Sequence, residues 1–195
     1  MNRSSLYLAP DDRDTVPALL LDRVAGRMPA AHRLGFLLQW RCLLESGGFP
    51  SSLQDLNVGW ITSLASQLGV SPRLAREYVW EGRAARRHRA ELRGLLGFRR
   101  CTNADLDRLI NWLVREVLPE AQAWNRVHAE ARTWLQTNQL EVPTDARLER
   151  AVRAALARHE REFCSQFVRK LSTPVTKALD ALLEIADEQS ASKLA

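Results

Sequence analysis

Glycine and proline residues divide this chain into segments whose lengths suit α-helices. This spacing constrains the fold class more than any other feature of the sequence. Between the interruptions, apolar residues recur at three- and four-residue spacing, whereas the alternation typical of strands is nearly absent. The sequence therefore predicts an all-α protein, a multi-helix bundle. The segments expected to be helical are 10–21 with a kink or break at Pro17, 29–45, 58–68, a stretch from Pro72 that continues or bends at Gly82, 83–96, 102–118, 121–138, 145–171 and 172–187.

One of these predicted helices, 29–45, is apolar over most of its surface. A helix that leaves little polar face belongs in the interior of a bundle, so we expect this one to lie at the centre of the core. Gly47 and Gly48 follow it and are expected to end it. Its large apolar residues are Leu34, Phe36, Leu37, Leu38, Trp40, Leu43 and Leu44.

A boundary between two small helical lobes is expected near residue 100. Gly97 ends the preceding helix, and Thr102 to Asp105 form a variant of the capping box that opens the next one. We therefore divide the chain into residues 1–100, a helical domain with a helix-turn-helix and a basic helix; 101–172, a second helical lobe; and 173–195, a terminal helix with a disordered tail.

Positive charge is concentrated in the stretch from Arg73 to Arg100. This stretch holds nine arginines against Glu77, Glu81 and Glu91, whereas the formal net charge of all 195 residues is only +5. The rest of the chain is therefore close to neutral. A single basic patch of this kind is typical of a site for a polyanion, most often nucleic acid.

The predicted helix 83–96 has one apolar side and one arginine-rich side. At 100° per residue, Ala84, Ala85, His88, Leu92, Leu95 and Leu96 share a face, and Arg83, Arg86, Arg87, Arg89 and Arg93 share the other. Like charges three and four residues apart destabilise a helix, and only Glu91 relieves them here. The pattern favours phosphate contacts by these five arginines and by Arg99 and Arg100.

The segment from Leu64 to Tyr78 has the spacing of a helix-turn-helix. Ala65 is the small residue at the expected helix crossing, and Gly69 supplies the turn. A second helix from Pro72 would then direct its first turns toward a major groove. The residues that it would present to DNA are Ser71, Arg73 and Arg76, of which the two arginines are the candidates for contacts with base edges.

Enzyme chemistry has little support in the sequence. The four histidines are isolated, and neither a glycine-rich phosphate loop nor a nucleophile elbow is present, so we expect no catalytic residue and no cofactor. Cys42, Cys101 and Cys164 are too widely spaced to suggest a zinc site or a disulfide framework. We expect no metal site, no membrane segment and a reducing cytoplasmic location associated with the nucleoid.

Several short blocks resemble one known family when taken in order. The block 86–99, RRHRAELRGLLGFR, is similar to the N-terminal region of transposases from class II replicative transposons, the Tn-three type. Five further blocks agree with it in order: 6–13, 33–39, 68–72, 112–119 and 147–156. The sequence departs from the family at Arg100 and Cys101, where relatives more often have a proline and an aromatic residue.

The resemblance implies a helical module that recognises the terminal inverted repeats of a transposon as double-stranded DNA. In that family the acidic catalytic triad, its metal ions and its RNase H-like fold lie far downstream, and nothing in this sequence corresponds to them. Self-association, or association with a catalytic transposase, is a further expectation. Two alternatives remain open: a stand-alone helix-turn-helix repressor that binds a palindromic site as a dimer, and a helical module whose basic face binds an acidic protein.

Overall fold

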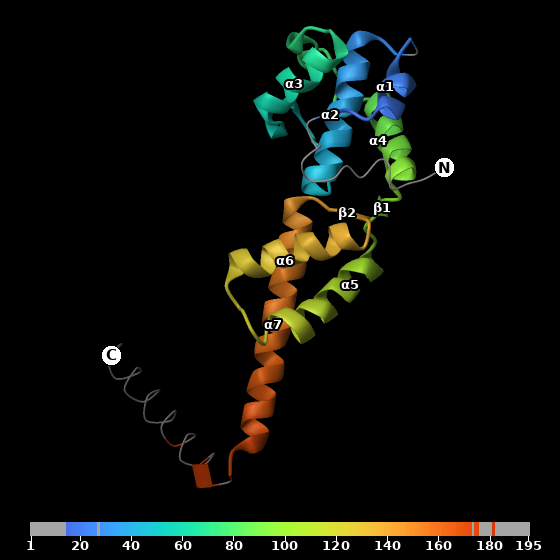
Figure 1. Cartoon of the computed structure of the whole chain (residues 1–195). Coiled ribbons are helices and arrows are strands. Elements are labelled where there is room, and N and C mark those ends of the chain that lie inside the picture. The colour runs from blue at the N-terminus through green and yellow to red at the C-terminus, as the bar shows by residue number, and fades with distance from the viewer. Residues whose placement is uncertain (1–14, 27, 173, 176–180, 182–195) are drawn as a thin grey trace, which may run out of the picture.

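The computed structural model describes residues 15–26, 28–172, 174–175 and 181, and in this part the protein is all-α, as predicted (Figure 1). The α-helices are α1 (Ala18–Val24), α2 (Ala30–Ser46), α3 (Val58–Leu68), α4 (Arg83–Leu96), α5 (Asn103–Trp112), α6 (Trp124–Thr137) and α7 (Asp145–Lys170). Shorter elements are the 3₁₀ segments η3 (Leu53–Asp55) and η4 (Pro72–Arg76), the π-helical segment η5 (Leu113–Val117), and the strands β1 (Arg99–Arg100) and β2 (Leu140–Glu141), which pair in parallel.

Helix α2 is the central helix of the first half of the molecule, which confirms the expectation from its composition. Every residue from Leu34 to Leu43 is buried, and α1, α3, η4 and α4 all pack against it. It ends at Gly47, whose φ of 71° lies in the left-handed region that favours glycine.

The buried hydrophobic residues form two clusters that divide along the chain. The first contains Trp40, Tyr78 and Leu92 among residues 16–98, and the second contains Leu109, Leu135 and Leu148 among residues 101–155. We call these parts the N-terminal lobe and the C-terminal lobe. Figure 1 shows the β1–β2 pair between them.

The two lobes are joined through the C-terminus of α2. The last carbonyl groups of a helix have no partner within it. Here the carbonyl of Glu45 accepts from Gln136 Nε2 at 3.2 Å, that of Ser46 from Arg132 Nη2 at 3.3 Å, and that of Gly47 from the backbone N–H of Val142 at 2.7 Å. The C-terminal lobe therefore caps the central helix of the N-terminal lobe.

The second helix of the expected helix-turn-helix does not form, and this prediction is wrong. Helix α3 ends at Gly69 with a φ of 63°, so the turn is where the sequence placed it. The following element, η4, is five residues of 3₁₀ helix, closed by bonds from Leu74 N–H to the Ser71 carbonyl at 3.1 Å and from Glu77 N–H to the Leu74 carbonyl at 3.1 Å.

Tertiary contacts explain why α-helix does not continue after Pro72. Ala75 of η4 and Tyr78, two residues after its end, are both buried in the core of the N-terminal lobe. The carbonyl of Trp80, which a helix would satisfy internally, instead accepts from Arg89 Nη2 at 2.8 Å. The chain then turns through Gly82 and starts again as α4.

The remaining predicted helices differ from the structure mainly at their ends. Pro17 stands at the start of α1 rather than within a helix, and the segment 10–14 lies outside the described residues. The predicted helix 102–118 begins with the expected capping box of Thr102 and Asp105, but its last part is the π-helical segment η5. The final predicted helix, 172–187, and the tail lie almost entirely outside the described residues.

Substitution of Gly47 should test how strongly the lobes are coupled. A Cβ there would lie 2.6 Å from Gln136 Cγ and 2.7 Å from Val142 Cγ2, whereas one at Gly69, with nearly the same φ, would meet nothing within 4 Å. Both alanine variants should lose about 1–2 kcal/mol to the left-handed backbone, and Gly47→Ala should lose about 1–3 kcal/mol more by overpacking. Urea unfolding measures both losses, and equal losses would contradict tight docking.

Candidate nucleic-acid interface

The face division predicted for α4 is confirmed by the structure. Ala85, His88, Leu92 and Leu96 are buried against the N-terminal lobe. On the opposite side Arg83, Arg86 and Arg87 are exposed, whereas Arg89 and Arg93 are half-buried. Since the apolar side fixes the rotation of the helix, it also decides which arginines reach solvent.

The N-terminal end of α4 is the most concentrated positive site on this face. Arg83, Arg86 and Arg87 are all exposed, and none of them has a carboxylate partner among the described residues. Gly82 stands at the N-cap, no side chain caps the helix, and its first turn contains no acidic residue. The free backbone N–H groups add the positive end of the helix dipole to the three guanidinium groups. Arg86 also donates to the carbonyl of Glu81 at 3.3 Å.

Ser71, Arg73 and Arg76 lie together on η4, although not on the α-helix that the sequence predicted. The Ser71 hydroxyl oxygen accepts from the N–H of Arg73 at 3.4 Å and caps the 3₁₀ turn. Both arginines are exposed and stand on the edge of a groove of about 480 Å³ lined by η3, α3 and η4. The next helix along the chain is α4, so the two sets of arginines come from consecutive elements.

Three of the predicted phosphate contacts are instead held by partners within the protein. Arg89 donates to the carbonyls of Pro50 at 2.7 Å and Trp80 at 2.8 Å. Arg93 pairs with Glu141 of the C-terminal lobe at 2.8 Å. Arg99 makes a bidentate pair with Asp105 at 2.6 and 2.7 Å. These contacts position the surface, whereas Arg100 is exposed and has no such partner in the described part of the chain.

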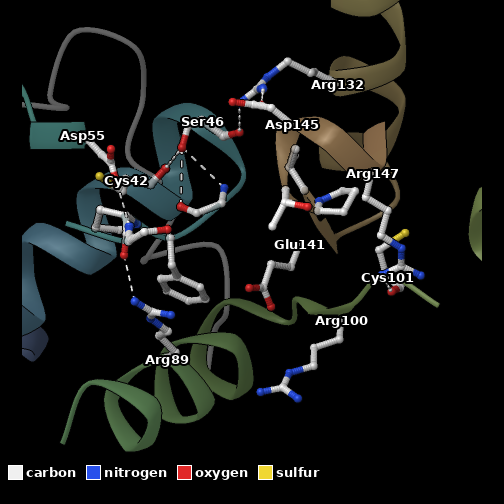
Figure 2. A pocket seen from close by; sticks show the side chains of 17 residues that line it. Cys42, Ser46, Asp55, Arg89, Arg100, Cys101, Arg132, Glu141, Asp145 and Arg147 are labelled. Atoms are coloured by element: carbon white, nitrogen blue, oxygen red, sulfur yellow. Dashed lines mark hydrogen bonds and ion pairs between the residues drawn. The ribbon is translucent and has the colours of Figure 1, made fainter. Parts of the chain in front are cut away.

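A cleft of about 670 Å³ separates the lobes on one side, and Arg100 lies at its edge (Figure 2). The cleft also contains Arg132 of α6 and Arg147 of α7. Arg132 pairs with Asp145 at 3.2 Å, and Arg147 donates to Asn103 Oδ1 at 2.6 Å. Both pairs lie within the C-terminal lobe, and docking of the lobes places them across the cleft from Ser46 and Pro50.

A buried polar chain lies directly beneath α4. Gln39 Nε2 donates to the Tyr78 hydroxyl at 3.1 Å, and that hydroxyl lies 2.8 Å from His88 Nδ1. Because the hydroxyl accepts from Gln39, its own proton is directed to His88, whose Nε2 has no partner among the described residues. Burial lowers the pKa of His88 to about 4, and the nearby His32 and Arg87 act in the same direction. The histidine is therefore neutral and ties α4 to α2.

Asp105 performs a similar role at the junction of the lobes. It is buried, closes the capping box of α5, and accepts from Arg99 and Arg108. The bidentate bond from Arg99 is the main reason that the pKa of this carboxyl lies far below its ordinary value. The pair holds β1, and with it Arg100, against the start of α5.

In the part of the chain that the structure describes, no group of three or more histidine, cysteine, aspartate or glutamate side chains could hold a metal ion. Burial, assisted by Asp55, raises the pKa of Cys42 to about 12. Within the same described residues, no helix is long and apolar enough to cross a membrane.

Comparison with protein families finds one match. The model of a domain of unknown function (DUF4158) matches residues 21–155, from α1 through the buried part of α7. It therefore covers both lobes and every arginine of the basic stretch. No curated protein matches the chain.

The stability of the protein should fall between pH 6.5 and pH 4 because of His88. Its folded-state pKa, about 4, lies below the ordinary value of 6.5, so the unfolded chain binds more protons in this window. The free energy of unfolding should drop by up to about 3 kcal/mol as the pH is lowered. Chemical denaturation at several pH values measures this slope. His88→Gln should flatten it, whereas the partly exposed His159→Gln should not; an unchanged slope in His88→Gln would contradict the assignment.

Proposed function

Because this chain belongs to the family of the domain of unknown function DUF4158, whose description assigns no activity, we propose its function from its own surface. It is a DNA-binding module that recognises the terminal inverted repeats of a transposon and leaves strand-transfer chemistry to a catalytic domain outside this chain. The resemblance of blocks such as 86–99 to class II transposases supports the identity of the DNA. The uncapped, arginine-rich start of α4 supports binding of a polyanion.

The charges at the start of α4 lower the stability of this helix. This observation is the main support for the proposal. Arg83 stands three and four residues before Arg86 and Arg87, so the like charges repel by about 0.2–0.5 kcal/mol per pair. Arg83 also lies in the first turn of α4, at the positive end of the helix dipole, where a basic residue is unfavourable. A phosphate group placed there reverses the sign of each of these terms, and free N–H groups are ready donors to it.

The exposed arginines divide into two groups by position. Arg83, Arg86 and Arg87 at the start of α4 are the proposed phosphate contacts, together with Arg100 on β1. Arg73 and Arg76 project from η4, next to the backbone path that leads into α4, and are the proposed contacts with base edges. Arg89, Arg93 and Arg99 act indirectly, because their contacts hold the loop before α4, α4 itself and β1 in place.

Arg83→Glu should improve folding and impair binding at once. A carboxylate in the first turn of α4 should raise stability by about 0.3–1 kcal/mol through the helix dipole. The same change should weaken binding to duplex DNA. Thermal unfolding and fluorescence anisotropy measure the two effects, and Arg115→Glu, an equal charge change on the exposed side of η5, is the matched control. If Arg83→Glu binds DNA as the wild type does, the start of α4 is not the phosphate site.

The two groups of arginines should differ in what they recognise. The double change Arg86→Ala and Arg87→Ala should weaken binding to an inverted repeat and to random duplex equally, and lower the salt slope by about 0.9 per lost contact. Arg73→Ala or Arg76→Ala should cost about 1–3 kcal/mol on the inverted repeat and much less on random duplex. Titrations at two salt concentrations distinguish these outcomes. If the η4 variants keep the wild-type ratio of affinity for the inverted repeat to affinity for random duplex, η4 does not contact base edges.

A further inference from the structure

The second half of α7 extends beyond the C-terminal lobe. The last core residue that the helix contributes is Ala155, and each residue from 160 to 170 is exposed. Figure 1 shows this part of α7 running past α5 and α6, and no other helix of the described residues lies beside it. An isolated helix of this length is marginal in water, because most helical stability in proteins comes from packing of an apolar face.

The exposed half of α7 nevertheless carries such a face. Phe163, Cys164, Phe167 and Val168 follow the spacing of one helix side. The exposed fractions of Phe163, Phe167 and Val168 are 63%, 55% and 58%, and the two phenylalanine rings stack with their centroids 6.5 Å apart. We call these four residues the α7 stripe. A contiguous exposed apolar surface of this kind marks an interaction site.

The charges at the two ends of the α7 stripe are opposite. Glu160 lies one turn before Cys164 on the same side, and Lys170 lies beside the stripe one turn after Phe167. Neither has an ion-pair partner among the described residues. A helix with an acidic end and a basic end along one apolar side is complementary to itself when reversed.

We propose that the α7 stripe binds the same stripe of a second copy of this chain, with the two helices antiparallel. With Glu160 opposite Lys170 of the second copy, Phe163 falls opposite Phe167 of that copy, and both contacts occur twice about a two-fold axis. Parallel pairing would instead place Glu160 against Glu160. The antiparallel arrangement also opposes the helix dipoles favourably.

The position of Cys164 makes this geometry measurable. In the proposed register the two-fold axis passes near residue 165, so the two Cys164 residues are separated by only about 3 Å along the helix axes. Cys42 and Cys101 are buried and do not compete for reagents. The inference rests on α7 alone and does not depend on DNA binding.

Sedimentation equilibrium of the full chain without DNA tests the proposal. The wild type should be in reversible monomer–dimer equilibrium at micromolar concentrations, and Phe167→Asp should weaken the dimer by at least about tenfold. Ser165→Asp adds the same charge on the other side of α7 and should leave the dimer intact. A monomeric wild type, or a dimer that Phe167→Asp does not weaken, overturns the proposal.

A charge exchange tests the antiparallel register. Glu160→Lys should weaken the dimer, and adding Lys170→Glu should restore it, because the two ends exchange sign together. Mild oxidation should join two chains through Cys164 and should fail in Cys164→Ser. If Glu160→Lys leaves the dimer unchanged, the helices are parallel, because one like-charged pair replaces another; if Cys164 of a monomer resists alkylation, another part of the same chain covers the stripe. Either result refutes the arrangement.

Discussion

The carbonyl groups at the C-terminus of α2 accept hydrogen bonds from the C-terminal lobe, and the relative placement of the two lobes depends on them. Gln136, Arg132 and the backbone of Val142 supply the donors. A buried carbonyl left without a partner costs about 1–3 kcal/mol, so each lobe completes the other. The same contact brings β2 beside β1 and so sets the path of the chain from α4 to α5.

The basic surface depends on this framework through buried polar contacts. The chain from Gln39 through Tyr78 to His88 links α2, the segment after η4, and α4. Arg89 then holds the loop before α4 by its bond to the Trp80 carbonyl. These contacts stop the helix that would otherwise run on from Pro72, and they fix the start of α4 as an exposed, uncapped helix end. The proposed DNA contacts follow from that arrangement.

Charge pattern alone could not separate the arginines of the basic stretch by role. In the sequence, Arg86, Arg87 and Arg89 are equivalent members of one charged run. In the structure the first two are exposed, whereas Arg89 donates to two backbone carbonyls outside α4. One belongs to Pro50, which is distant in sequence, and the other to Trp80, in the loop before the helix. Arg93 and Arg99 likewise meet acidic partners, and that of Arg93 belongs to the other lobe. Such partners depend on tertiary packing, which local spacing does not encode.

Local chemistry determined the helices themselves. The bounds of α3 and α4, the central position of α2 and the capping box of Thr102 and Asp105 follow from apolar period, glycine stops and short-range side-chain bonds, all of which act within a few residues. Tertiary structure decided what these signals could not: that η4 is a 3₁₀ turn, since Tyr78 and Trp80 are held by α2 and Arg89, and which arginines remain exposed. Both outcomes depend on contacts between residues far apart in the chain. The free energy of these contacts exceeds the local preference for α-helix.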